Sequence, residues 1–182
     1  PESQKPESQK PESQTSESKI IRDATPADRE AILDLNRRAF GQPDEAEIVA
    51  KLEKAGDILL ELVAEHDGQI VGHILFYPLG VFGKLGAAGL GPMCVDPWVQ
   101  REGVGSFLVR KGMMHMQEAG VPIVFVLGHE TYYPRFGFSV EATKDFDTPL
   151  KGPHFFANRL RFGPPMSGKL IFPEAFGVPI SG

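Results

Sequence analysis

The stretch that most constrains the fold runs from Leu90 to Gly120 and reads LGPMCVDPWVQREGVGSFLVRKGMMHMQEAG. A short apolar run ends at Val95, and an uninterrupted helical pattern later extends to Gly120. Between them lies a loop that contains Gly103 and Gly105. A strand, a glycine-containing turn and a helix in this order direct backbone N–H groups and a helix N-terminus at one point. Because the peptide dipoles leave partial positive charge there, this turn predicts a site for a phosphate or pyrophosphate group.

The two glycines of this turn do not complete a nucleotide-binding motif. Neither G-x-x-x-x-G-K-[ST] nor G-x-G-x-x-G is present, which argues against nucleoside triphosphate and dinucleotide sites. Gly103 and Gly105 lack a Cβ atom, so a ligand can approach the backbone closely. Two glycines are also typical of a tight turn at a helix start, so the turn alone does not establish a binding site.

Composition narrows the class of protein. With 182 residues, 41% of them hydrophobic, the chain is large enough for one well-packed core. A net charge of -5 without a run of Lys or Arg predicts no nucleic-acid partner. The single cysteine, Cys94, excludes an internal disulfide and indicates a reducing, cytoplasmic location. Without an apolar run of ~20 residues or a signal-peptide pattern, we expect no membrane partner. The dispersed histidines predict no metal site.

The first 18 residues are a low-complexity segment built on PESQK repeats. They contain no apolar side chain, so burial cannot offset the entropy lost on ordering. We expect residues 1–18 to be a disordered tail, natural or appended, although an arm that folds on a partner is the alternative reading. Residues 19–182 show no break in composition and are expected to form a single domain.

Hydrophobic periodicity and turn residues predict the elements of this domain. Thr25, Pro26 and Asp28 form a strong helix start. Asp67 and Gly68 are typical of a hairpin turn.

We expect strands over 19–24, 58–66, 69–77, 90–95, 123–127, 155–161 and 169–172, and helices over 25–41, 44–55 and 104–119. Residues 78–89 are expected to be a loop or a poorly formed strand start, and residues 128–138 a short helix or turn followed by a new strand. The second helix is predicted to bury Ile48, Leu52 and Ala55, and Gly72 to mark a bulge or a close backbone approach. The domain is therefore α/β (α+β).

Two motifs in this order resemble the GNAT superfamily of acetyl-CoA-dependent N-acetyltransferases. The family has [Q/R]-x-x-G-x-[G/A] after its fourth strand, and here QREGVG at 100–105 follows Val95, Asp96 and Pro97. It also has a Tyr four residues before a G-F pair, and here YPRFGF at 133–138 matches. The phrases LG at 127–128 and YYPRFGF at 132–138 are similar to the YhbS-like branch. The resemblance implies a mixed, mostly antiparallel central sheet with splayed strands 4 and 5 and flanking helices.

The resemblance also implies a reaction, the transfer of an acetyl group from acetyl-CoA to a primary amine of a small molecule or protein. The amine would attack directly in a ternary complex. Pantetheine would lie along the fourth strand, and the pyrophosphate would sit on backbone N–H groups of the turn. The cofactor-binding residues implied in this way are Met93, Cys94, Val95, Gln100, Arg101, Glu102, Gly103, Val104, Gly105 and Ser106.

Tyr133 is the residue that the resemblance implies as the general acid for the departing thiolate. A phenol, whose ordinary pKa is near 10, is neutral at pH 7 and can donate a proton. The alternative for Tyr133 is an aromatic ring that packs on CoA or in the core. Tyr132 is expected to pack or to line the acceptor site.

The general base is not fixed by the sequence. Some family members have a glutamate on the fourth strand, but residues 87–95 contain no acidic side chain. His129, Glu130, His73 and Asp96 are the candidates, with a water relay as the alternative. A structural role is favoured for His73 in mid-strand and for Asp96 in a turn. Glu130, with His129, lies beside Tyr133 and is the catalytic candidate to test first.

Several alternatives stay open at this point. Cys94 could carry the acyl group covalently, although a lone cysteine in an apolar strand is usually a small buried hydrophobe. The chain could also be a non-catalytic acyl-CoA-binding or regulatory module. We expect the acceptor to be lined by residues 38–46 and by the loops after Pro78 and Glu141. The identity of the acceptor and the oligomeric state are open, a homodimer being compatible with the sequence.

Overall fold

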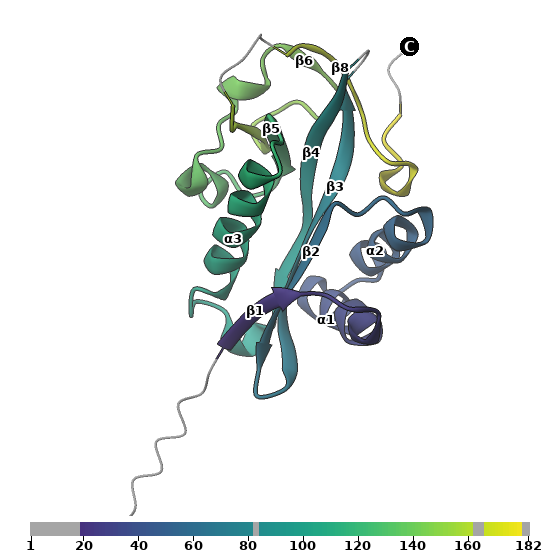
Figure 1. Cartoon of the computed structure of the whole chain (residues 1–182), viewed down its shortest axis with the longest axis vertical. Coiled ribbons are helices and arrows are strands. Elements are labelled where there is room, and N and C mark those ends of the chain that lie inside the picture. Colours follow the sequence, from purple (N-terminus) through teal and green to yellow (C-terminus); the bar gives the residue numbers. More distant parts are fainter. Residues whose placement is uncertain (1–18, 82–83, 162–165, 180–182) are drawn as a thin grey trace, which may run out of the picture.

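The structure is a computed structural model that describes residues 19–81, 84–161 and 166–179 (Figure 1). The predicted tail, residues 1–18, lies outside the described residues. The strands are β1 (Lys19–Asp23), β2 (Leu60–His66), β3 (Gln69–Val81), β4 (Lys84–Val95), β5 (Ile123–Leu127), β6 (Phe146–Asp147), β7 (Phe155–Arg159) and β8 (Gly168–Ile171). The α-helices are α1 (Arg29–Phe40), α2 (Asp44–Ala55) and α3 (Val104–Glu118). Short 3-10 helices are η1 (Pro26–Asp28), η2 (Pro97–Val99), η3 (Tyr133–Phe136), η4 (Glu141–Thr143) and η5 (Glu174–Phe176).

The elements form an open, mostly antiparallel sheet of 8 strands with flanking helices. The strand order is β1-β2-β3-β4-β5-β7, with β8 paired to the far end of β3 and β6 paired to β8. Helix α3 covers one face of the sheet, and α1 and α2 cover the other (Figure 1). This arrangement confirms the predicted mixed α/β fold. Among the described helices, none is long and apolar enough to cross a membrane.

The feature that positions the site is the separation of β4 from β5. These parallel strands pair only over Ala88–Leu90 of β4, and the last pair is Leu90 with Val126. Beyond it β4 continues to Val95 along β3, after a register irregularity opposite Leu75, while β5 ends at Leu127. The two strands therefore diverge after Leu90, as the resemblance predicted.

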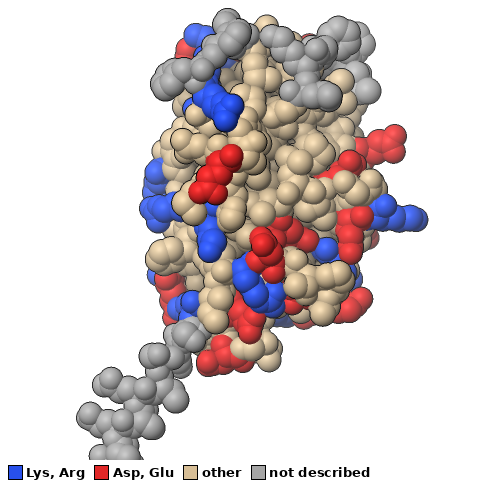
Figure 2. All heavy atoms as spheres, viewed as in Figure 1, with Lys and Arg blue, Asp and Glu red and all other residues tan. Residues whose placement is uncertain are grey.

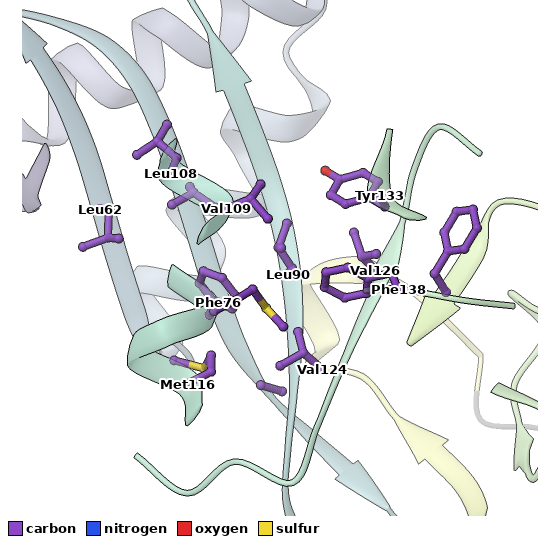
Figure 3. Packing of buried hydrophobic residues seen from close by; sticks show 14 of the residues in the cluster. Leu62, Phe76, Leu90, Leu108, Val109, Met116, Val124, Val126, Tyr133 and Phe138 are labelled. Atoms are coloured by element: carbon purple, nitrogen blue, oxygen red, sulfur yellow. The ribbon is translucent and has the colours of Figure 1, made fainter. Parts of the chain in front are cut away.

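Helix α3 packs on the sheet at two glycines where a Cβ atom would not fit. Its own Gly112 packs on the ring of Phe76, where an added Cβ atom would overlap the ring. On β3, a Cβ atom at Gly72 would lie 2.9 Å from a methyl carbon of Leu108. These contacts belong to an apolar cluster between α3 and the sheet (Figure 3). The close approach expected at Gly72 is confirmed, and it fixes the helix whose N-terminus forms the turn.

The opposite face of the sheet is held to α1 by a buried polar chain. His73 on β3 is 0% exposed, and its Nδ1 lies 3.1 Å from the Asn36 side-chain nitrogen. Because that amide donates, Nδ1 accepts, and Nε2–H of His73 donates to Glu61 at 2.8 Å. Arg29 contacts both Glu61 oxygens at 3.0 Å. Burial would raise the pKa of Glu61, but the bonds from His73 and Arg29 hold it below its ordinary value. His73 is thus a structural residue.

Signals between neighbouring residues in the sequence correctly predicted the bounds of several elements. Helix 44–55 and strand 123–127 are confirmed, and the Asp67-Gly68 turn has positive φ at both residues, 48° and 74°. At the helix start, Asp28 accepts hydrogen bonds from the backbone N–H and hydroxyl of Thr25, at 2.8 and 3.1 Å. These features depend on neighbours in the sequence, which explains why the sequence alone predicts them.

Three expectations were wrong. Of the two alternatives for residues 78–89, the loop is wrong. Residues 84–89 are the start of β4, as the other alternative predicted, and residues 78–81 belong to β3, because β3 pairs with β4 on one side and with β8 on the other. Ala55 is exposed, since α2 faces the core with Ala46, Val49 and Leu52. The new strand expected at the end of residues 128–138 does not form, and among the described residues there Ser139 makes only an isolated bridge with Ala157.

We predict that Gly112→Ala lowers the free energy of unfolding by about 1–3 kcal/mol, because the new methyl group must displace the Phe76 ring or the helix. Chemical denaturation followed by circular dichroism measures the change. Met114→Ala, on an exposed position of the same helix, is the control and should cost less than about 1 kcal/mol. Equal stability of wild type and Gly112→Ala would contradict the close packing of α3.

Candidate active site

A cavity of about 1000 Å³ opens where β4 and β5 separate. It brings together most of the residues that the sequence predicted for the cofactor and for catalysis. Those that line it are Met93, Cys94, Val95, Gln100, Arg101, Gly103, Val104, Gly105, Ser106 and Tyr133. Glu102 and Glu130 do not line it. Glu102 instead forms an ion pair with Lys19, and Glu130 is exposed.

The N-terminus of α3 presents free backbone donors to this cavity. Gly103 precedes the helix with φ of 83°, and no side chain caps the first turn. The first intrahelical bond there runs from Phe107 N to Gly103 O, so the N–H groups of residues 104–106 have no partner within the helix. A Cβ atom at Gly105 would lie 2.8 Å from the hydroxyl oxygen of Tyr132. Residues 101–106, called the cradle below, therefore offer unpaired backbone N–H groups to which an anion can bind.

Arginine side chains add positive charge beside the cradle. Arg101 and Arg135 both line the cavity. The Arg135 guanidinium carbon lies 4.5 Å from the centre of the Tyr132 ring. Gln100 ties the loop to the end of β4 by donating to the carbonyl of Val95 at 3.2 Å. Elsewhere, on the face shown in Figure 2, Lys and Arg of the described residues are interspersed with Asp and Glu rather than gathered in one basic area.

Tyr133 is held as a protonated phenol at the cavity. Its ring packs edge-on against Tyr132 and Phe138, with centroids 5.1 and 5.9 Å apart, and its side-chain oxygen points away from Val126 and Phe138 (Figure 3). Only 8% of the residue is exposed, and no described residue hydrogen-bonds to its hydroxyl. Burial, with a smaller contribution from Tyr132, raises the pKa of Tyr133 well above its ordinary value. The phenol is therefore a proton donor at neutral pH.

The four residues predicted as candidate general bases lie in different parts of the structure. His129 lines the cavity and is exposed. Asp96 lies outside it, where its carboxylate binds Arg38 at 2.7 Å and the backbone N–H of Trp98 at 3.0 Å. Burial would raise the pKa of Asp96, but these bonds hold it below its ordinary value. With His73 in the buried polar chain, only His129 of the four reaches the cavity.

One acidic side chain that the sequence did not single out lines the cavity. Glu45, in the first turn of α2, is half-buried, and the Gln42 amide nitrogen donates to its two oxygens at 2.8 and 3.1 Å. The expected acceptor segment, residues 38–46, includes it without giving it a role. Helical spacing was a usable signal for this residue. Glu45 lies three residues before Ile48 and therefore on the same side of α2, and both line the cavity.

Cys94 is an unfavourable nucleophile in these surroundings. It is 4% exposed, and burial raises the pKa of its thiol to about 12, with the charges of Glu45 and Asp96 adding to the effect against Arg38. Because the thiolate is the reactive form, covalent acyl transfer through Cys94 is disfavoured. No group of three or more His, Cys, Asp or Glu among the described residues is arranged to hold a metal ion.

The divergent parallel strands, the cradle after the first of them and the phenol after the second define a fold of the N-acetyltransferase class. The sequence profile of the Acetyltransferase (GNAT) domain matches residues 20–140. The chain belongs to the GNAT acetyltransferase family.

Two Escherichia coli K12 proteins are similar in sequence. The uncharacterized N-acetyltransferase YjhQ is 41% identical over 117 residues, which are 62% of this chain and 65% of YjhQ, just under two thirds of its length. The uncharacterized N-acetyltransferase YhbS is 37% identical over 128 residues, 69% of this chain and 77% of YhbS.

Two crystal structures share the fold. YhbS from Escherichia coli in complex with CoA has a TM-score of 0.84 and 32% identity, covering 89% of this chain and 93% of YhbS. A GNAT family acetyltransferase from Brucella melitensis in complex with acetyl-CoA has a TM-score of 0.76 and 35% identity, covering 88% and 99% of the two chains. The predicted similarity to the YhbS-like branch is confirmed.

We predict that Cys94→Ala keeps wild-type activity within about threefold, because the thiol is buried and protonated. Iodoacetamide should label wild type at pH 8 far more slowly than it labels free cysteine, because burial raises the pKa of the Cys94 thiol. Mass spectrometry measures the labelling. An inactive Cys94→Ala variant that still binds acetyl-CoA would support covalent transfer instead.

Proposed function

We propose that this protein transfers the acetyl group of acetyl-CoA to a primary amine of a small molecule or protein, by direct attack in a ternary complex. In this proposal residues 19–182 act as a single acetyltransferase domain in the cytoplasm, and the oligomeric state, a homodimer included, is left to measurement. The observation that carries it is the cavity itself, which joins free helix N–H groups and a protonated phenol at the split between two parallel strands.

The carrier side of the cavity suits acetyl-CoA. The cradle offers uncapped N–H groups and positive helix-end charge to a pyrophosphate, with Arg101 and Arg135 beside it. Met93, Cys94 and Val95 continue the cavity along β4, where pantetheine would lie. YhbS from Escherichia coli binds CoA and the Brucella melitensis protein binds acetyl-CoA, which supports the same ligand here.

The chemistry then needs few groups from the protein. The amine nitrogen, after losing a proton, attacks the thioester carbonyl, and the C–N bond forms as the oxygen takes negative charge. A backbone N–H of β4 is the proposed donor to that oxyanion. When the intermediate collapses, the C–S bond breaks and Tyr133 donates its proton to the leaving sulfur. Water takes both protons that the nitrogen loses, one from the ammonium group before the attack and one as the intermediate collapses. The products are an amide and the free thiol of CoA, and Tyr133 regains its proton from solvent.

The non-catalytic module is the second candidate, and the placement of Tyr133 favours the enzyme over it. A binding module needs only the cradle and the β4 edge. The chain also keeps a buried phenol that lines the cavity and whose hydroxyl no described residue uses. Structural packing alone would be served by phenylalanine at this position.

We predict that Gly105→Val weakens acetyl-CoA binding at least tenfold, about 1.4 kcal/mol, because its side chain would fill the space between the cradle and the Tyr132 hydroxyl. Isothermal titration calorimetry measures the dissociation constant. Gly152→Ala is the control, since nothing lies within 4 Å of a Cβ atom there. No heat of acetyl-CoA binding to the wild-type protein would overturn the proposed carrier site.

We predict that Tyr133→Phe lowers kcat by about 10²-fold to 10⁴-fold and leaves the acetyl-CoA dissociation constant within about twofold, because it removes only the proton donor. Thiol detection of released CoA gives kcat. Tyr132→Phe is the matched variant, and any effect there should fall on the KM for acetyl-CoA, since that hydroxyl lies over the cradle. An unchanged kcat in Tyr133→Phe would rule out its role as the acid.

A further inference from the structure

The cavity has a second side, across the sheet from the cradle. Helix α3 lies on one face of the sheet, and α1 and α2 lie on the other (Figure 1). Because β4 and β5 separate, one cavity is lined both by the start of α3 and by residues that pack with α1 and α2. The lining residues of this second side include Ile48, Leu150, Phe155, Phe172 and Phe176. An acceptor that meets a thioester carried along β4 would occupy this side.

The second side carries an aromatic wall, made of Tyr77, Phe172 and Phe176. The ring of Tyr77 lies 4.3 Å from that of Phe176 and 6.2 Å from that of Phe172, measured between centroids. Tyr77 lies across Gly89 of β4, directly before the point where β4 and β5 part. Phe172 and Phe176 follow β8 and lie beyond the 20–140 region that matches the family. The C-terminal segment therefore supplies apolar surface to the cavity that the family match does not include.

One negatively charged side chain lines the same cavity as this aromatic wall. Among the described residues that line the cavity, Glu45 is the only carboxylate, and no lysine lines it. Gln42 holds the carboxylate through both oxygens. Its charge contributes to the raised pKa of Cys94 on β4, so its field reaches the strand along which the thioester would lie. The arginines that line the cavity, Arg101 and Arg135, belong to the cradle and to η3.

We infer that the acceptor is a primary monoamine on an aromatic or apolar body, with its ammonium group paired to Glu45 and its body against the aromatic wall. The inference rests on the proposed function and names its substrate class. An ammonium group is attracted by a half-buried carboxylate and by the faces of aromatic rings. An aryl or alkyl body replaces water on the partly exposed rings of Phe172 and Phe176, which pack on Tyr77, and gains the free energy of apolar burial.

The same features select against other amines. A polyamine, an aminoglycoside or a lysine-rich peptide brings further charges or hydroxyl groups, and Glu45 can pair with only one cation. The remaining polar groups would lose their hydrating water against the aromatic wall without gaining a hydrogen-bond partner, which disfavours binding. A small polar amine such as ethanolamine would pair with Glu45 and leave the wall unused.

The experiment measures kcat/KM at saturating acetyl-CoA for 2-phenylethylamine, tryptamine, hexylamine, ethanolamine, spermidine, kanamycin and a lysine-containing peptide. We expect 2-phenylethylamine or tryptamine to exceed ethanolamine, spermidine, kanamycin and the peptide by at least about tenfold. Phe176→Ala should reduce the ratio of 2-phenylethylamine to ethanolamine at least about threefold, because it removes part of the wall.

Glu45→Gln tests the charge separately from the wall. It should raise KM for 2-phenylethylamine at least about tenfold while the acetyl-CoA dissociation constant stays within about twofold. Glu47→Gln, exposed on the same first turn and not lining the cavity, is the matched control and should match wild type. An unchanged KM in Glu45→Gln would overturn the pairing.

The outcomes separate this inference from the function on which it rests. If ethanolamine, spermidine, kanamycin or the peptide is the best acceptor, the substrate class is wrong while acetyl transfer to an amine stands. If acetyl-CoA binds but no amine in the panel raises CoA release above hydrolysis, the substrate class is overturned and the non-catalytic module is favoured. If acetyl-CoA does not bind, the proposed function itself fails.

Discussion

The structure depends on one constraint, the loss of pairing between two parallel strands after only three residues. Up to Leu90 the two strands are hydrogen-bonded to each other, and after Leu90 the β4 backbone borders a cavity. Because the strands are parallel, the chain leaves both of them at the same edge of the sheet. The loop after β4 therefore delivers the cradle and the segment after β5 delivers Tyr132 and Tyr133 to one place. The contact between the Tyr132 hydroxyl and Gly105 is the direct sign of this convergence.

Such a gap persists only if the elements around it are fixed. On one face, α3 is fixed by Gly112 against Phe76 and by Gly72 against Leu108, contacts that leave no room for larger residues. On the other face, the buried chain from Asn36 through His73 to Glu61 holds α1 to the sheet. Apolar packing holds the carrier side, while buried hydrogen bonds, which fix geometry more narrowly, hold the helix that leads into the acceptor side.

Local signals were enough to predict the fold class and the cradle, because glycines, turn pairs and helix periodicity act between neighbours in sequence. The strand structure of residues 78–81 and 84–89 was hidden by the proline and glycines of this stretch, whose weak strand preference is overridden by pairing on both sides of β3. Sequence proximity also misleads within the site. Glu130 precedes Tyr133 by one short turn yet is exposed, whereas Glu45, far away in sequence, lines the same cavity. Helix periodicity places Glu45 on the same side of α2 as Ile48, but whether that side lines the cavity depends on how α2 packs.

The charges of the cavity are arranged in a way that suits turnover under the proposed function. The anionic carrier is held by the helix end and the arginines, and these interactions are the same for acetyl-CoA and CoA. The ammonium of the acceptor is held by Glu45, but acetylation turns it into a neutral amide, so that attraction is lost in the product. The aromatic wall contacts substrate and product alike. Glu45 therefore strengthens binding of the amine substrate but not of the amide product, which favours release of the product.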